Sequence, residues 1–158
     1  MERSSIDTEA IRAGSSRDYV PALENTRCSL WSSRVLQTAD MAAVARARRR
    51  NYEHWLSEVE TLDGCAPLFG ALDEQTVPYM FPLILENPDC QFDALKRLGM
   101  PMFRWDALAD SDCLVSSRYR TGLVHLPCHQ GIDADMLAQL VDILRQGLAN
   151  AIDRKAVA

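Results

Sequence analysis

Two histidines and a cysteine near residue 128 are the side chains whose spacing first suggests chemistry. His125 and His129 are four residues apart, but Pro127 lies between them in an apolar stretch typical of a strand. The two rings therefore need not share one face, as they would on a metal-binding helix. Cys128 and His129 are neighbours, and neighbouring side chains of an extended chain point in opposite directions. We predict no metal site, and we interpret Cys128 as a small buried thiol beside a surface or cleft histidine.

A second pair, Arg104 and Trp105, stands at the end of a predicted strand. A guanidinium and an indole at such a place can hold an anionic or ring-shaped ligand. The alternative is a surface arginine stacked on the tryptophan. Nucleotide-binding folds with a Gly-rich phosphate loop are excluded, because the seven glycines are dispersed and neither GxGxxG nor GxxxxGK[ST] occurs.

The charge balance argues against a general nucleic-acid binder. Acidic residues outnumber Lys and Arg by 22 to 17, a formal net charge of −5, and duplex affinity rests largely on cations that neutralise phosphates. The exception is a run of arginines, for which we expect a solvated helix face or ion pairs with glutamates at helical spacing. The residues concerned are Arg46, Arg48, Arg49, Arg50, Glu53, Glu58 and Glu60.

Cysteine usage and the N-terminal residues indicate a cytoplasmic protein. The five cysteines are scattered and never form a CxxC pair, which favours reduced thiols over a disulfide framework or a zinc site. The first residues, MERSSIDTEAIRAGSSRDY, carry charges where a secretory signal would be apolar. No stretch approaches the roughly 18 apolar residues of a membrane helix. We therefore expect neither export nor membrane insertion.

Three helical patterns follow one another along the chain. Apolar residues recur at about 3.6-residue spacing over 33–60, without Pro or Gly, which predicts one long helix or two helices joined near Asp40. Asn87 to Asp89 can cap a second helix, and Gly99 supplies its stop signal. Asp133 opens a final helix with a regular apolar face.

Three short apolar runs, at 77–85, 100–105 and 122–128, are predicted strands. Pro78 and Pro82 favour an edge position or a bulge for the first strand. The pattern predicts an α+β fold, with a small, mainly antiparallel sheet of three to four strands packed against helices and a long N-terminal helix. The segments 62–75 and 106–117 are expected to be loops, the latter with room for a helical turn.

Four segments resemble, in order, the C-terminal part of pyridoxal phosphate (PLP)-dependent aminotransferases of the DegT/DnrJ/StrS type, which mostly make amino sugars on nucleotide carriers. They are RARRRNYEHWL from Arg46, VPYMFPLIL from Val77, FDALKRLGM with MPMFRW behind it, and LVHLPCHQGIDADMLAQLVDIL from Leu123.

The resemblance implies a small domain over about 33–150 that closes over the sugar side of a PLP site in a normally homodimeric enzyme. The residues before it mix Ser, Arg, Asp and Pro with few periodic apolar positions, which predicts a loosely ordered lead-in over 1–32. Residues 151–158 are expected to form a tail. The cleft-facing candidates carried over by the resemblance are Arg104, Trp105, His129 and Gln130. Where many members have a His-Tyr-Pro stretch, this chain has Phe103 to Asp106, so the substrate contacts are expected to differ.

The resemblance also implies that PLP binding depends on residues of a second, larger domain. In that family the lysine, the carboxylate and the phosphate cup that bind PLP come from a large domain, which would precede residue 33. The chain has two lysines, Lys96 and Lys155, and neither is in a setting expected to lower an amine's pKa. We therefore expect no cofactor in this chain alone, PLP only with a large domain, and no catalysis without one.

Two other interpretations stay open at this point. The chain could be a stand-alone, non-catalytic dimerisation or ligand-binding module derived from the fold, or, with least support, an independent enzyme using Arg104, His125 or His129. Whether the chain is a piece of an aminotransferase or such a stand-alone module, we expect a homo-oligomer or a large-domain partner and an exposed apolar face. Candidates for that face are Trp31, Val35, Leu36, Met41 and Trp55, although Trp55 also repeats with an apolar stripe that predicts core or interface.

Overall fold

The computed structural model describes residues 20–104 and 111–157, with side chains as far as Ala151. The chain divides into two compact units, one up to Ala39 and the other from Asp40 onward. Trp105 and most of the predicted lead-in therefore lie outside the described residues.

The described part of the first unit contains a short 3-10 helix, η1 (Pro21–Leu23), and an α-helix, α2 (Leu30–Thr38). Ser29 caps α2, because its hydroxyl oxygen accepts a hydrogen bond from Ser32 N at 3.0 Å. No residue of η1 or α2 is buried. Local capping, rather than a core, accounts for the structure seen in this unit.

The expected single long N-terminal helix is not present. The segment is divided at Ala39, which has an extended ψ of 130°, and the next helix, α3 (Met41–Val59), begins after Asp40. The carboxylate of Asp40 accepts a hydrogen bond from Ala43 N at 2.8 Å and so satisfies a first-turn donor of α3. The alternative of two helices joined near Asp40 is confirmed.

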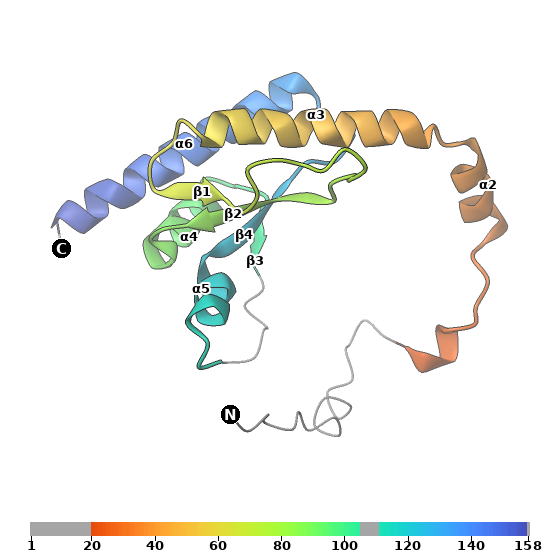
Figure 1. The fold of residues 1–158 in the computed structure, drawn as a ribbon, viewed down its shortest axis with the longest axis horizontal. Coiled ribbons are helices and arrows are strands. Elements are labelled where there is room, and N and C mark those ends of the chain that lie inside the picture. The colour runs from red at the N-terminus through yellow and green to blue at the C-terminus, as the bar shows by residue number, and fades with distance from the viewer. Residues whose placement is uncertain (1–19, 105–110, 158) are drawn as a thin grey trace. The chain divides into compact units, whose positions relative to one another are not determined.

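The predicted antiparallel sheet is confirmed and has four strands in the order β1-β2-β4-β3 (Figure 1). All three pairings are antiparallel. The strands are β1 (Cys65–Pro67), β2 (Met80–Leu85), β3 (Phe103–Arg104) and β4 (Leu123–Pro127). β1 corrects the expectation of a loop over 62–75, because three of those residues pair with Leu83 to Leu85.

The predicted edge position of the Pro-containing strand is wrong, since β2 lies between β1 and β4. The carbonyl of Pro82 faces the β1 side, where it accepts a hydrogen bond from Leu68 N at 3.0 Å, one residue beyond the end of β1. The missing N–H of Pro82 therefore removes no bond from the β2–β4 ladder.

Three further helices complete the second unit. α4 (Pro88–Arg97) ends as predicted at Gly99, whose φ is +84°. Gly99 N bonds to Lys96 O and Met100 N to Leu95 O, the pattern of a Schellman motif. α5 (Leu114–Gly122) is longer than the helical turn expected near 106–117, and α6 (Ala134–Val157) continues to the end of the described residues.

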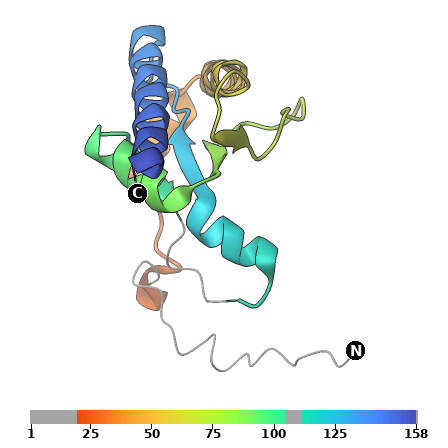
Figure 2. The ribbon, with the colours of Figure 1, turned by 90° about the vertical axis from the view of Figure 1, so that its left-hand side faces the viewer.

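The core lies between one face of the sheet and three helices. Phe81, Leu83 and Leu85 alternate along β2, and with Val124 and Leu126 of β4 they contact buried side chains of α3, α4 and α6. α3 and α6 lie on this side of the sheet, and α5 lies on the other (Figure 1, Figure 2). Ile84 and Leu123, on the second face, are also buried.

Trp55 belongs to this core and not to an exposed face. Its exposed fraction is 0%, and its ring stacks near Phe81 at 6.2 Å between centroids. Trp31, Val35, Leu36 and Met41 are exposed as expected. None of the helices in the described part of the chain is both long and apolar enough to cross a membrane.

The arginine run divides between ion pairing and backbone contacts. Arg49 pairs with Glu53 one turn later at 3.9 Å, as expected. Glu58 instead pairs with Arg145, which joins α3 to α6. Arg48 and Arg49 also donate to carbonyls far away in the sequence.

Candidate functional site

Three side chains of α3 hold the loop that follows β4. Arg48 Nε donates to Gln130 Oε1 at 2.8 Å. Asn51 Nδ2 donates to the carbonyls of His129 and Ile132 at 2.9 and 3.2 Å, and Trp55 Nε1 donates to Pro127 O at 2.9 Å. Residues spaced three and four apart project from the same side of a helix, so this one stripe fixes the whole loop.

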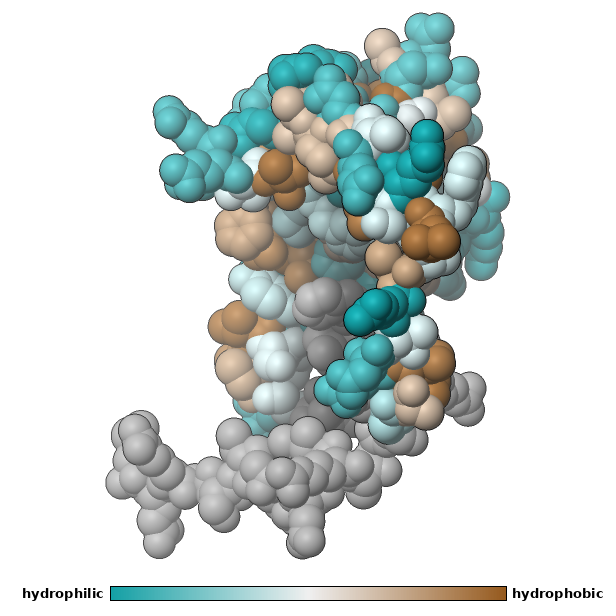
Figure 3. Space-filling view, turned by 90° about the vertical axis from the view of Figure 1, so that its right-hand side faces the viewer, coloured by the Kyte–Doolittle hydropathy of each residue, from teal (hydrophilic) through white to brown (hydrophobic). Residues whose placement is uncertain are grey.

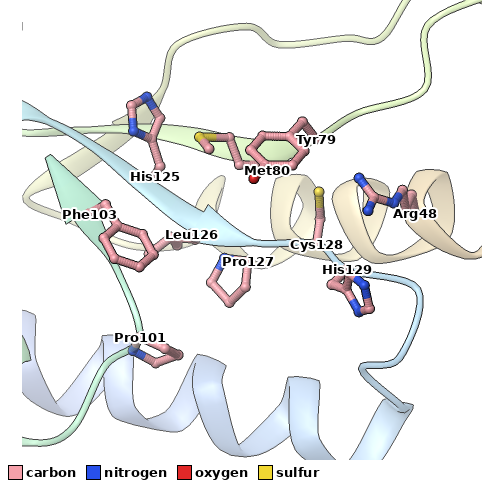
Figure 4. A pocket seen from close by; sticks show the side chains of 10 residues that line it. All are labelled: Arg48, Tyr79, Met80, Pro101, Phe103, His125, Leu126, Pro127, Cys128 and His129. Carbon is pink, nitrogen blue, oxygen red and sulfur yellow. The ribbon is translucent and has the colours of Figure 1, made fainter. Parts of the chain in front are cut away.

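A pocket with a volume of about 160 Å³ lies beside this loop. It is bordered by α3, by the start of β2, by β3 with the residues before it, and by β4 (Figure 4). The lining residues are Arg48, Tyr79, Met80, Pro101, Phe103, His125, Leu126, Pro127, Cys128 and His129.

His129 is exposed at the pocket, and Cys128 is fully buried. Burial raises the pKa of Cys128 to about 11, and nearby Arg48 only partly opposes this effect. The thiol is therefore protonated near neutral pH and points its Sγ at Pro78 O, 3.7 Å away. The interpretation of a buried thiol beside a surface or cleft histidine is confirmed, and Cys128 is unsuited to act as a nucleophile.

The sequence-predicted candidates do not form one group. His129 lines the pocket, and Gln130 lies next to it through its hydrogen bond to Arg48. Arg104 lies elsewhere, with its Cζ 4.1 Å from the centroid of Phe92 on α4. Trp105 is outside the described residues, so its predicted stacking on Arg104 is not addressed by the structure.

The other titratable side chains in or near the pocket are those of His125 and Lys96. His125 is buried opposite Phe103 and Pro82 in the ladder, and burial lowers its pKa, which favours the neutral ring. Lys96 Nζ donates to Met102 O at 3.1 Å and lies 6.0 Å from the Phe103 ring centroid. Among the residues that the structure describes, no three His, Cys, Asp or Glu side chains cluster as metal ligands.

Sequence reasoning missed most of the lining residues. Arg48 is one of a run of arginines, and nothing in the local pattern distinguishes it from Arg49. Tyr79 and Phe103 were seen only as parts of apolar strand segments. In the structure both lie where a strand begins, Tyr79 directly before β2 and Phe103 as the first residue of β3, but the predicted strands over 77–85 and 100–105 placed them inside, so the sequence carried no signal for them.

No protein-family model and no curated protein sequence matches the chain. The fold is nevertheless similar to part of several solved enzymes. The sugar aminotransferase CalS13 from Micromonospora echinospora matches with a TM-score of 0.58 at 19% identity, over 68% of this chain and 32% of that one. PseC of Helicobacter pylori, an aminotransferase involved in the biosynthesis of pseudoaminic acid, matches with a TM-score of 0.58 at 11% identity, over 68% of this chain and 33% of that one.

DesV of S. venezuelae, solved in complex with a ketimine intermediate, matches with a TM-score of 0.59 at 15% identity, over 72% of this chain and 34% of that one. At these identities the likeness concerns the fold. The chain spans about one third of the length of each of these proteins. Its fold is therefore similar to that of about a third of a sugar aminotransferase chain.

Proposed function

We propose that the chain is the small C-terminal domain of a PLP-dependent aminotransferase of the DegT/DnrJ/StrS type, acting on a nucleotide-linked keto sugar. The observation that carries the proposal is the fold, which matches the aminotransferases CalS13 and PseC, and DesV with its ketimine intermediate, over more than two thirds of this chain and about a third of theirs. The order of the four family-like segments supports the same assignment. In this proposal the domain spans about 33–150.

Lys96 is the one lysine whose side chain lies in the described part of the chain, and its setting supports the proposal that this chain alone holds no PLP site. A Schiff-base lysine needs a free amine, whereas the amine of Lys96 donates to Met102 O and lies beside Phe103. We infer that the chain alone is inactive and that a PLP-binding large domain supplies the cofactor site.

His129 and Gln130 stay the proposed cleft-facing residues of the domain. Both lie on the loop that Arg48 and Asn51 hold against α3, so their position is fixed by the domain itself. Arg104 remains a proposed contact as well, although its guanidinium lies over Phe92. Trp105 completes the set by the family resemblance.

The exposed apolar residues of α2 support the proposal of a homo-oligomer, and the proposed cytoplasmic location rests on the scattered cysteines. Leu30, Trp31 and Leu36 are 92%, 76% and 65% exposed. Figure 3 shows apolar side chains at the surface, interspersed among hydrophilic ones. Sedimentation analysis of the chain and of a Trp31→Ser, Leu36→Ser variant checks this proposal, because the variant should shift association to higher concentration.

The function itself is tested by titration of the purified chain with PLP, followed by borohydride reduction and peptide mapping. We expect no stoichiometric adduct. A Lys96→Met variant is the matched control for weak, non-specific imine formation. A stoichiometric reducible adduct on Lys96 or Lys155 would show that the chain is a PLP site in its own right and would overturn the proposal.

A further inference from the structure

The guanidinium of Arg48 is held rigidly at one end of the pocket. Its Nε donates to Gln130 Oε1 at 2.8 Å and its Nη1 to Pro78 O at 3.3 Å. The Cζ atom lies 5.8 Å from the centroid of the Tyr79 ring. A guanidinium has five N–H donors, so these contacts leave three of them for other partners. Figure 4 shows this side chain beside Tyr79 and Cys128.

His129 adds a second donor at the same end. Its Nδ1 accepts a hydrogen bond from Gly131 N at 3.1 Å. In the neutral imidazole this contact places the proton on Nε2, which is then a donor. Among the described residues that line the pocket, none carries a carboxylate. In this part of the chain, the end of the pocket at Arg48 and His129 therefore presents donors and positive charge without a carboxylate partner.

The rest of the pocket is mostly apolar, with His125 as a further polar side chain in its lining. Pro101, Phe103, Pro127 and Met80 line it, and the Phe103 ring is 71% exposed. A cavity of about 150 Å³ accommodates a benzene ring, and this pocket has about 160 Å³. Its size and walls fit one planar six-membered ring.

We propose that the pocket binds a free, single-ring monocarboxylate, with the carboxylate on Arg48 and His129 and the ring between Phe103, Pro101 and Pro127. A carboxylate suits the fork of donors on a guanidinium. A flat ring suits the aromatic and prolyl walls. The site does not depend on the aminotransferase proposal, since every group in it belongs to this chain.

Benzoate is the probe for this site, and benzamide is the matched probe without the charge. Each is titrated into the full ¹⁵N-labelled chain while amide chemical shifts are recorded. We expect benzoate to bind with a dissociation constant on the order of 1 mM, as suits so small a ligand. Its shifts should centre on Gly131 and Phe103. Benzamide should bind about 10-fold more weakly, because charge-assisted hydrogen bonds are lost.

The variants separate the charge from the walls. Arg48→Met should weaken benzoate about 10-fold and leave benzamide nearly unchanged. Arg49→Met is the control, because Arg49 donates to Asp73 O and Thr76 O outside the pocket, and it should change neither. Phe103→Ala, at an exposed position that tolerates truncation, should weaken both probes about 5-fold.

Equal affinity for benzoate and benzamide would overturn the proposal, and so would an equal effect of the two arginine variants. Absence of benzoate shifts at 20-fold above the expected dissociation constant would do the same. If Arg48→Met fails to fold, the benzoate-to-benzamide ratio of the unmodified chain and the Phe103→Ala titration still decide the matter.

Discussion

Helices α2 and α3 follow one another in the sequence and differ in what they bury. α2 carries Leu30, Trp31, Val35 and Leu36, yet none of its residues is buried. α3 has a strongly charged middle, yet it buries Asn51, Tyr52, Trp55 and Val59. Apolar content alone therefore does not decide which of the two helices enters a core.

The hydrogen bonds of the two helices explain the difference. The side-chain bonds of the described residues in α2 reach at most four residues along the chain. Those of Arg48, Asn51 and Trp55 in α3 reach 30 to 82 residues, to Pro78 before β2, to the end of β4 and to the loop after it. The side chains of α3 donate hydrogen bonds to distant carbonyls, which fix the position of this helix in the second unit. The described side chains of α2 form hydrogen bonds only within the helix and its cap.

The two tryptophans offer the largest contrast. Trp55→Ala removes a fully buried ring and a hydrogen bond to Pro127 O, and it should lower the free energy of unfolding by about 3–5 kcal/mol. Trp31 is 76% exposed, so Trp31→Ala should change it by less than about 0.5 kcal/mol. Urea denaturation followed by circular dichroism measures both. Similar losses for both variants would mean that α2 has a buried partner.

The side-chain amides of Asn51 in α3 and Gln37 in α2 give the next contrast. Asn51 donates to two carbonyls of the loop, and Asn51→Ala should cost about 1–3 kcal/mol, because two partly buried acceptors lose their donor. Gln37 in α2 donates only to Ser33 Oγ at 3.5 Å, so Gln37→Ala should have almost no effect. Amide hydrogen exchange at Gly131 and Ile132 should rise in the first variant alone. Unchanged exchange there would show that the loop holds its shape without Asn51.

The N-caps compare the same chemistry in the two settings. Asp40 caps α3 and Ser29 caps α2, each through a side-chain oxygen. Asp40→Ala should lower the free energy of unfolding by about 1 kcal/mol. Ser29→Ala should melt the first turn of α2 without moving the main transition. A loss of equal size at Ser29 would indicate that the two helices unfold together.

A pH-dependent contribution belongs to the second unit, since all three histidines follow Asp40. Burial lowers the pKa of His125 below its ordinary value of 6.5. The unfolded chain then takes up the proton first, so the stability this ring supports is complete above about pH 6.5 and is lost as the pH falls toward the folded pKa. His125→Gln should reduce the loss of stability between pH 7 and pH 5, measured by urea titrations. An unchanged slope would exclude His125 as the cause.

The sheet and several helix ends were predictable from the sequence because their signals are local. Gly99 ends α4 in a left-handed conformation that glycine adopts freely. The apolar run from Val77 to Leu85 is enough to predict a strand, although it does not show which face of β2 meets the core, since Ile84 on the other face is also apolar and buried. In each case the residues near in sequence also determine the geometry.

Features set by distant contacts could not be predicted. β1 has three residues and exists because Leu83 to Leu85 offer it a partner. Pro82 suggested an edge strand, but β2 is central. Pro82 is tolerated there because it faces Leu68, one residue beyond the end of β1, where its missing N–H breaks no strand pairing. The pocket depends on Arg48 reaching Gln130, 82 residues away, which no periodicity encodes.

Removal of residues 1–39 should have the smallest effect of all, and it tests the comparison as a whole. A chain beginning at Met-Asp40 keeps the cap of α3 and every buried residue of the core. Its free energy of unfolding should agree with that of the full chain within about 0.5 kcal/mol. Its denaturant m-value should also be unchanged, because m follows the surface that unfolding exposes and α2 buries none of its residues. A lower m-value together with a loss above about 1 kcal/mol would show that the first unit packs on the second, and the contrast between α2 and α3 would then be one of degree.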